Sequence, residues 1–134
     1  MTEELRKVLS EIQTSLCSVT VSMRRCIDNG LETNIDNMDH LGQSLIVLAD
    51  RFRNQLKELK HTVLTITLIE AGVSIRGRVS KMKRRGVLSE DIVFFDEVYS
   101  FIKLIEDSIA SGEYYKELVK IYRGKLSEDL HTRI

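Results

Sequence analysis

Six cationic side chains lie within ten residues in the middle of the chain. They are Arg76, Arg78, Lys81, Lys83, Arg84 and Arg85. Guanidinium groups form forked hydrogen bonds that match phosphate geometry, and six such contacts would give nucleic-acid binding a log–log salt slope of about −5. No aromatic residue lies among them, so the base stacking used by single-strand binders is missing. The segment therefore predicts either a surface for nucleic acid or another anion, or a solvated connection between helices.

Two Glu-x-x-His pairs have a spacing that di-iron helical bundles use for metal ligands. They are Glu58 with His61 and Glu128 with His131. Counted at about 100° per residue from the nearest apolar stripe, both pairs point away from the predicted buried face. Ligands of a metal held in a bundle must point inward, so we predict no metal site.

Other catalytic chemistry has little support in the residues. The histidines are His40, His61 and His131, and no serine or cysteine is joined to one of them by a nucleophile motif. The sequence has no glycine-rich phosphate loop and no cysteine pair at metal-binding spacing. We predict a protein that is not an enzyme and holds no cofactor.

Composition favours helices. The chain has 134 residues, of which 43% are hydrophobic and 30% charged, and it contains no proline. Proline costs a helix interior about 3 kcal/mol, so its absence suits long helices. We predict one domain over residues 1–134 and an all-α fold.

The first predicted helix, residues 3–28, has apolar residues at alternating intervals of four and three. The sequence caps this helix with Thr2 and ends it at Asn29-Gly30. The residues of this heptad seam are Leu5, Leu9, Ile12, Leu16, Val19, Met23 and Cys26.

A second apolar pattern starts at Ile35 and continues to about residue 70, near 55 Å as one helix. Folded back on the first helix, it predicts an antiparallel hairpin over residues 1–72. Within it, the β-branched run Thr62–Ile69 could also form a strand, and helix is the preferred interpretation because no partner strand follows.

Residues 73–88 contain glycines among the cations and predict a basic connection or a frayed helix end. Ser89-Glu90-Asp91 then predicts the start of a third helix, and a fourth follows Ser111-Gly112. The predicted fold is an antiparallel hairpin of two long helices plus a shorter C-terminal helical pair over residues 89–134, similar to a four-helix bundle.

The second predicted helix is longer than the helices that could cover it, so we predict an uncovered coiled-coil seam. Such a seam associates with a second copy or with a partner helix. The leading hypothesis is a non-enzymatic interaction or oligomerisation module, acting as an adaptor or structural subunit, and nucleic-acid binding through residues 76–85 is the alternative. The predicted interface residues are Leu9, Leu16, Met23, Leu45, Leu48 and Phe52.

Charge and cysteine usage bear on location. Net charge is zero, although residues 51–85 carry ten basic and two acidic groups, while the segments on either side are acidic. No run of about 20 uncharged residues could span a membrane. Cys17 and Cys26 lie too far apart on one helix to form a disulfide. Free thiols suit a reducing compartment, so we predict an intracellular protein, cytoplasmic or, if the run 81–85 directs import, nuclear.

Overall fold

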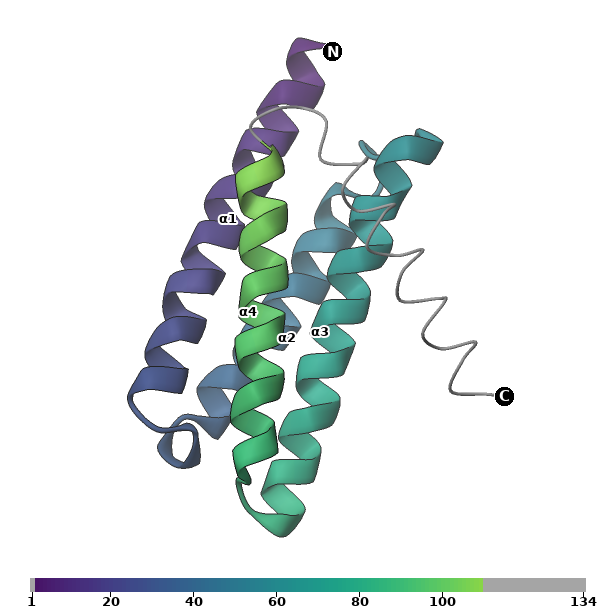
Figure 1. Ribbon diagram of the computed structural model, residues 1–134. Helices are drawn as coiled ribbons and strands as arrows, with labels where there is room; N and C mark the ends of the chain where they lie inside the picture. Colours follow the sequence, from purple (N-terminus) through teal and green to yellow (C-terminus); the bar gives the residue numbers. More distant parts are fainter. Residues whose placement is uncertain (1, 110–134) are drawn as a thin grey trace, which may run out of the picture.

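The computed structural model describes residues 2–109, which form a bundle of four α-helices (Figure 1). The helices are α1 (Glu3–Asp28), α2 (Ile35–Phe52), α3 (Leu59–Arg85) and α4 (Ser89–Ile109), and a 3₁₀ turn, η1, covers Leu31–Thr33. Successive helices run in opposite directions, and no strand occurs over residues 2–109. The predicted all-α, bundle-like fold class is confirmed.

Helix α1 matches its prediction at both ends. The hydroxyl of Thr2 accepts a hydrogen bond from the backbone N–H of Leu5 at 3.2 Å, which satisfies one of the free donors of the first turn. At the other end Gly30 has a φ of 99°, a conformation that side chains with a Cβ rarely adopt. Six of the seven seam residues are buried, and Leu5 is partly exposed.

The predicted second helix is two helices. Helix α2 ends at Phe52, and a turn over residues 53–58 reverses the chain into α3. Leu56 within this turn is buried, so the reversal is itself anchored in the core. A single helix of about 55 Å would have left its apolar side uncovered, whereas the turn lets the two halves bury that side against each other.

Close packing of α2 on α3 depends on two glycines. A Cβ on Gly72 would lie 2.5 Å from the carbonyl oxygen of Gly42 and 2.6 Å from Cγ1 of Ile46. A Cβ on Gly42 would lie 3.0 Å from the carbonyl oxygen of Gly72. The two backbones therefore approach at a distance that only glycine allows, and α2 and α3 form the most extensive helix pair in the bundle.

The β-branched run Thr62–Ile69 is helical, as preferred. Two of its threonine hydroxyls donate hydrogen bonds to backbone carbonyls one turn earlier, from Thr67 to Val63 at 2.7 Å and from Thr62 to Glu58 at 3.2 Å. Their hydroxyl groups are thus satisfied inside the helix.

The predicted basic connection at residues 73–88 is wrong for residues 73–85, because α3 continues to Arg85, and only residues 86–88 connect α3 to α4. Ile75, Val79 and Met82 maintain the helical spacing of buried residues through this segment. Its glycines therefore do not break the helix, and Gly86, with a φ of 88°, is the residue at which the helix ends.

Helix α4 begins at Ser89, as predicted, and runs to Ile109. The helix predicted after Ser111-Gly112, the second member of the C-terminal pair, lies outside the described residues.

Candidate interaction surface on α2 and α3

The predicted interface residues lie in the core of the bundle. Each of them is less than a tenth exposed and packs within one continuous hydrophobic cluster of the same chain, which contains Leu9, Leu16, Met23, Leu45, Leu48 and Phe52. The seam of α1 is therefore covered by the chain's own helices, and a surface for association has to be sought elsewhere.

The cations of residues 76–85 project from both sides of α3. On the side toward α2, Nε of Arg76 lies 3.3 Å from the carboxylate of Asp39, and its Nη1 donates to the amide oxygen of Gln43 at 2.7 Å. About two turns further along α3, Nζ of Lys83 lies 3.0 Å from Oδ1 of Asp36. These pairs attach the basic half of α3 to the acidic first half of α2.

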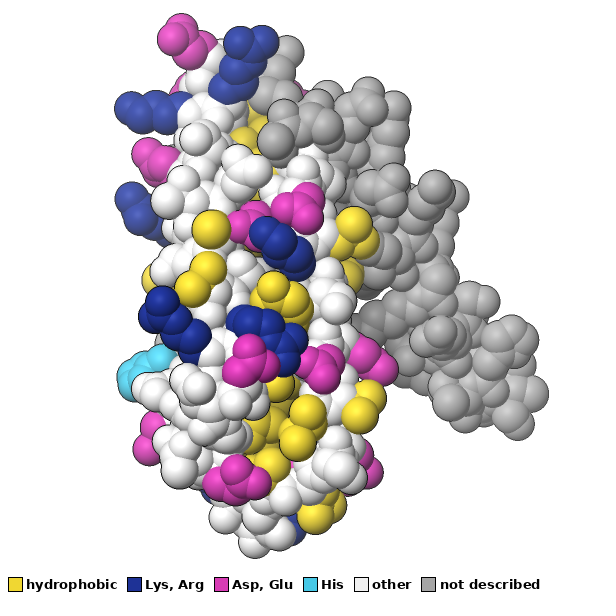
Figure 2. All heavy atoms as spheres, turned by 60° about the vertical axis from the view of Figure 1, so that its left-hand side comes forward, with side chains coloured by type: hydrophobic (Ala, Val, Ile, Leu, Met, Phe, Trp, Pro, Cys, Tyr) yellow, Lys and Arg dark blue, Asp and Glu magenta, His cyan; other side chains and the backbone are white. Residues whose placement is uncertain are grey.

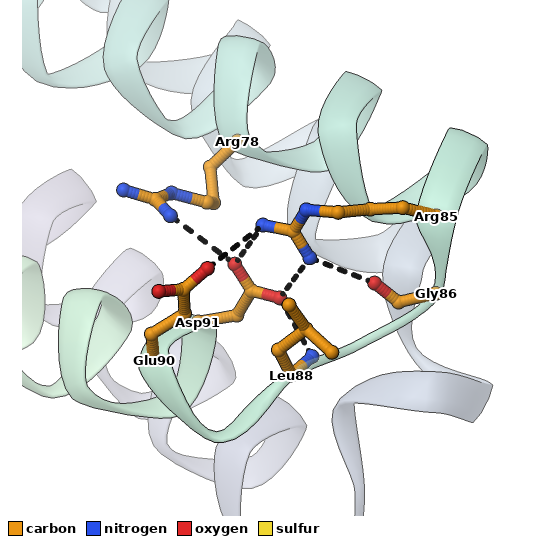
Figure 3. Close-up of polar contacts among 6 residues, drawn as sticks. All are labelled: Arg78, Arg85, Gly86, Leu88, Glu90 and Asp91. Atoms are coloured by element: carbon orange, nitrogen blue, oxygen red, sulfur yellow. Dashed lines mark hydrogen bonds and ion pairs between the residues drawn. The ribbon is translucent and has the colours of Figure 1, made fainter.

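On the side toward α4, Arg78 and Arg85 converge on Asp91 (Figure 3). Arg85 forms two hydrogen bonds with the carboxylate, both of 2.9 Å, and Nη1 of Arg78 lies 3.3 Å from Oδ1. The carboxylate also accepts the backbone N–H of Leu88 at 2.8 Å, which caps the first turn of α4.

Asp91 is 0% exposed, so its charge depends on these partners. The guanidinium of Arg85 holds the pKa of the Asp91 carboxyl well below its usual range, and the Leu88 N–H and Arg78 act in the same direction against the effect of burial. Arg78 also stacks on Phe94, with Cζ 4.4 Å from the ring centroid. This cluster joins α3 to the start of α4, and its ion pairs stabilise the contact between the two helices.

Only two of the six predicted anion-binding residues lack an ion pair with a described residue. Lys81 and Arg84 are both exposed, whereas Arg76, Arg78, Lys83 and Arg85 all have carboxylate partners within 4 Å. Most of the cations of residues 76–85 therefore form ion pairs inside the bundle. Two, rather than six, remain free to bind an external anion without breaking such a pair within the described residues.

Exposed aliphatic side chains follow the outer face of α3. Ile66, Ile69 and Val73 are all at least a third exposed, and their spacing of three and four places them on one stripe of the helix. Val47, on the neighbouring helix α2, is also exposed. The sequence analysis did not identify this stripe. The spacing of 66, 69 and 73 differs from that of the buried residues 64, 68 and 75, and this difference could have separated an exposed face from a buried one.

A groove between α2 and α3 continues this stripe toward the C-terminal end of α3. Val73, Gly77, Ser80 and Ile46 line it, and its rim carries both signs of charge, from Asp39, Arg76 and Lys83. A Cβ added to Gly77 would meet no atom within 4 Å. Gly77 is therefore not required by packing inside the bundle, in contrast to Gly42 and Gly72.

The face of α1 and α4 has a different character. Figure 2 shows it with acidic and basic side chains next to one another and hydrophobic side chains in small separate groups. Arg24 of α1 is within 3.1 Å of Asp28 and Asp96, and Nζ of Lys103 is 2.8 Å from the buried carboxylate of Glu106. The pair of Arg24 with Asp96 connects α1 to α4, and the other two pairs each lie within one helix.

Cys17 lies beside Glu106 on this α1–α4 face. The carboxylate raises the pKa of the Cys17 thiol by hydrogen bonding to it and by charge repulsion of the thiolate. A raised pKa lowers the thiolate fraction at neutral pH, so this environment does not activate a nucleophile.

No group of three or more His, Cys, Asp or Glu residues within the described residues could hold a metal ion. His61 is buried, which corrects the predicted outward orientation. The prediction took Leu59 as the centre of the buried stripe, whereas the buried face of α3 follows Leu64, Leu68 and Ile75, and His61 lies three residues before Leu64 on that face. Glu58 is exposed, and Glu128 and His131 lie outside residues 2–109.

Three comparisons bear on identity. No family model, curated protein or solved structure significantly matches this chain. Among the described helices, none has the length and apolar character needed to cross a bilayer.

Proposed function

We propose that this chain is a non-enzymatic helical interaction module, a structural subunit or adaptor that associates with a second copy of itself through the outer face of α2 and α3. The observation that carries the proposal is the stripe of Ile66, Ile69 and Val73 beside the groove at Gly77. Burial of each such side chain against a partner is favourable by about 1.5–3 kcal/mol.

Exposed apolar residues elsewhere in the described bundle do not form such a stripe. At the start of α4, Leu88, Ile92 and Val93 are exposed, but they extend over little more than one turn. Leu104 lies eleven positions further along than Val93, with Glu97 and Ser100 between them. Val21 is exposed singly on α1, and scattered residues of this kind are normal on monomeric proteins. A second copy is the favoured partner because the chain has zero net charge, so two copies meet without overall repulsion.

Replacing Val73 with glutamate is expected to dissociate the dimer without unfolding the chain. In a symmetric dimer the substitution occurs twice, and a loss of about 1.5 kcal/mol per valine raises the dissociation constant about 100-fold. Light scattering on a sizing column, at low and high salt, should give twice the 15.4 kDa chain mass for the native protein and the single mass for the variant.

The matched control is Val93→Glu on α4, because the two valines are almost equally exposed, at 57% for Val93 and 56% for Val73. The Val93 variant should keep the native mass. Loss of association in both variants, or a native protein that stays monomeric at both salt concentrations, would contradict the proposal.

A second candidate, nucleic-acid binding through residues 76–85, is supported only by the exposed pair Lys81 and Arg84. Two phosphate contacts in place of six predict a log–log salt slope of about −2. Titration of a labelled duplex from about 50 mM salt upward measures this slope, and Lys81→Glu with Arg84→Glu should abolish any binding. A slope near −5 would mean that the ion pairs of α3 open when nucleic acid binds.

A further inference from the structure

The outward stripe of α3 has two unlike halves. Its residues follow the helical spacing from Ile66 through Ile69, Val73, Gly77 and Ser80. The half that precedes Val73 is bulky and exposed, and the half that follows it is small and lines the groove beside α2. Glycine is a poor residue for a helix interior, and no contact within the described bundle requires one at position 77. A closely approaching helix would require it.

The two halves are complementary when α3 meets a second copy in the opposite direction. With the two-fold axis at Val73, residue 69 lies opposite residue 77 of the other copy, and residue 66 lies opposite residue 80. Each isoleucine then faces a residue small enough to receive it, and the same contacts recur on both sides of the axis, as in an isologous interface.

Charge favours the same direction. All six cations of residues 76–85 lie in the C-terminal half of α3, whereas residues 59–75 carry Lys60 and Glu70, whose charges cancel. A parallel pair would place the six cations of one copy against those of the other. An antiparallel pair places them against the half that has no net charge, with Arg84 opposite Thr62.

We infer that two copies of this chain pair α3 against α3 in antiparallel orientation about a two-fold axis at Val73, with Ile69 of each copy over Gly77 of the other. The inference rests on the proposed homodimer and specifies its geometry. Association through the same face in a parallel direction would satisfy the proposed function and would contradict this inference.

Spin-label distances in the full-length chain distinguish the two directions. A label at position 84, introduced by Arg84→Cys with Cys17→Ser and Cys26→Ala, reports one distance per dimer. The two labelled positions are 22 residues apart along the antiparallel pair, about 33 Å, and about 10 Å apart in a parallel pair. Arg84 is exposed and lacks an ion pair with a described residue, so the label disturbs little of the fold.

Gly77→Leu tests the contact itself. The added side chain fills the groove, so the dissociation constant should rise at least tenfold while the helical content stays unchanged. Ser74→Leu adds the same side chain at an exposed position about 100° around the helix from Val73 and should leave the dissociation constant as it is.

The outcomes separate the two proposals. A dimer with a distance near 33 Å and sensitivity at position 77 alone supports the inference. A dimer with a distance near 10 Å, or one that tolerates leucine at position 77, overturns the antiparallel contact and leaves the interaction module standing. A monomer at every concentration overturns both.

Discussion

Replacing Asp91 with alanine is expected to lower the free energy of unfolding by about 3 kcal/mol, since removing one member of a buried ion pair leaves the others uncompensated. The carboxylate receives two hydrogen bonds from Arg85, an ion pair from Arg78 and the N–H of Leu88. Arg78 and Arg85 are partly exposed, so water takes over some of their charge and keeps the loss at the lower end of the range for buried pairs. Urea denaturation followed by circular dichroism measures the change.

Asp91→Asn isolates the charge from the helix cap. The amide keeps an oxygen that can accept the Leu88 N–H, but it cannot form charged pairs with Arg78 and Arg85. We expect the free energy of unfolding of Asp91→Asn to lie between that of the native protein and that of the alanine variant. Asp36→Asn is the control, because the Asp36 side chain is 85% exposed and its pair with Lys83 lies at the surface. Asp36→Asn should change the free energy of unfolding by no more than about 0.5 kcal/mol.

The pH dependence of unfolding gives a second readout for Asp91. Its pKa is lower in the folded chain than the unfolded value of about 4. A lowered folded pKa contributes stability that is fully present above the unfolded pKa and is lost as the pH falls below about 4 toward the folded pKa. Asp91→Asn should therefore flatten this part of the stability curve. If the variant lost stability below pH 4 as steeply as the native protein does, carboxylates other than Asp91 would be responsible for that loss.

Replacing Gly72 with alanine is expected to destabilise the chain by about 2 kcal/mol. The new Cβ would overlap the carbonyl oxygen of Gly42 and Cγ1 of Ile46, so α2 and α3 must move apart. Overpacking of this kind costs up to about 3 kcal/mol, and the better helix propensity of alanine offsets about 1 kcal/mol of it. Chemical denaturation at a concentration low enough to give monomers measures the net effect.

Gly77→Ala is the matched control on the same helix and has the opposite expected sign. Its Cβ meets no atom within 4 Å, so only the gain in helix propensity, about 1 kcal/mol, remains in the monomer. If Gly72→Ala stabilises the chain as much as Gly77→Ala does, the close approach of α2 and α3 is not present in solution.

Local patterns in the sequence were sufficient to predict α1 and the starts of α2 and α4. The heptad spacing from Leu5 to Cys26 and the cap at Thr2 depend only on residues within the same helix. The same holds for the cap at Ser89 to Asp91, where the carboxylate of Asp91 bonds the N–H of Leu88 three residues earlier. Periodicity and capping are local, so they can be read without knowing what packs against the helix.

The reversal at residues 53–58 could not be predicted in this way. Both arms have helical spacing, and no proline or glycine marks the turn. What places it is the close approach of Gly42 and Gly72, thirty residues apart, which lets α2 and α3 cover each other. Gly77 in the basic segment was misinterpreted as a break, because a single glycine costs a helix about 1 kcal/mol, which the burial of Ile75, Val79 and Met82 on either side of it outweighs.

The sequence alone determined the helical class, the first helix and the alternation of acidic and basic blocks. The tertiary structure decided which of those residues face inward and which face solvent. It buried the predicted interface residues Leu9, Leu16 and Leu45, paired most of the cations of residues 76–85 with carboxylates of α2 and α4, and left Ile66, Ile69 and Val73 exposed. The physical reason is that periodicity shows that a helix has an apolar side, whereas only the arrangement of neighbouring helices determines how much of that side is covered.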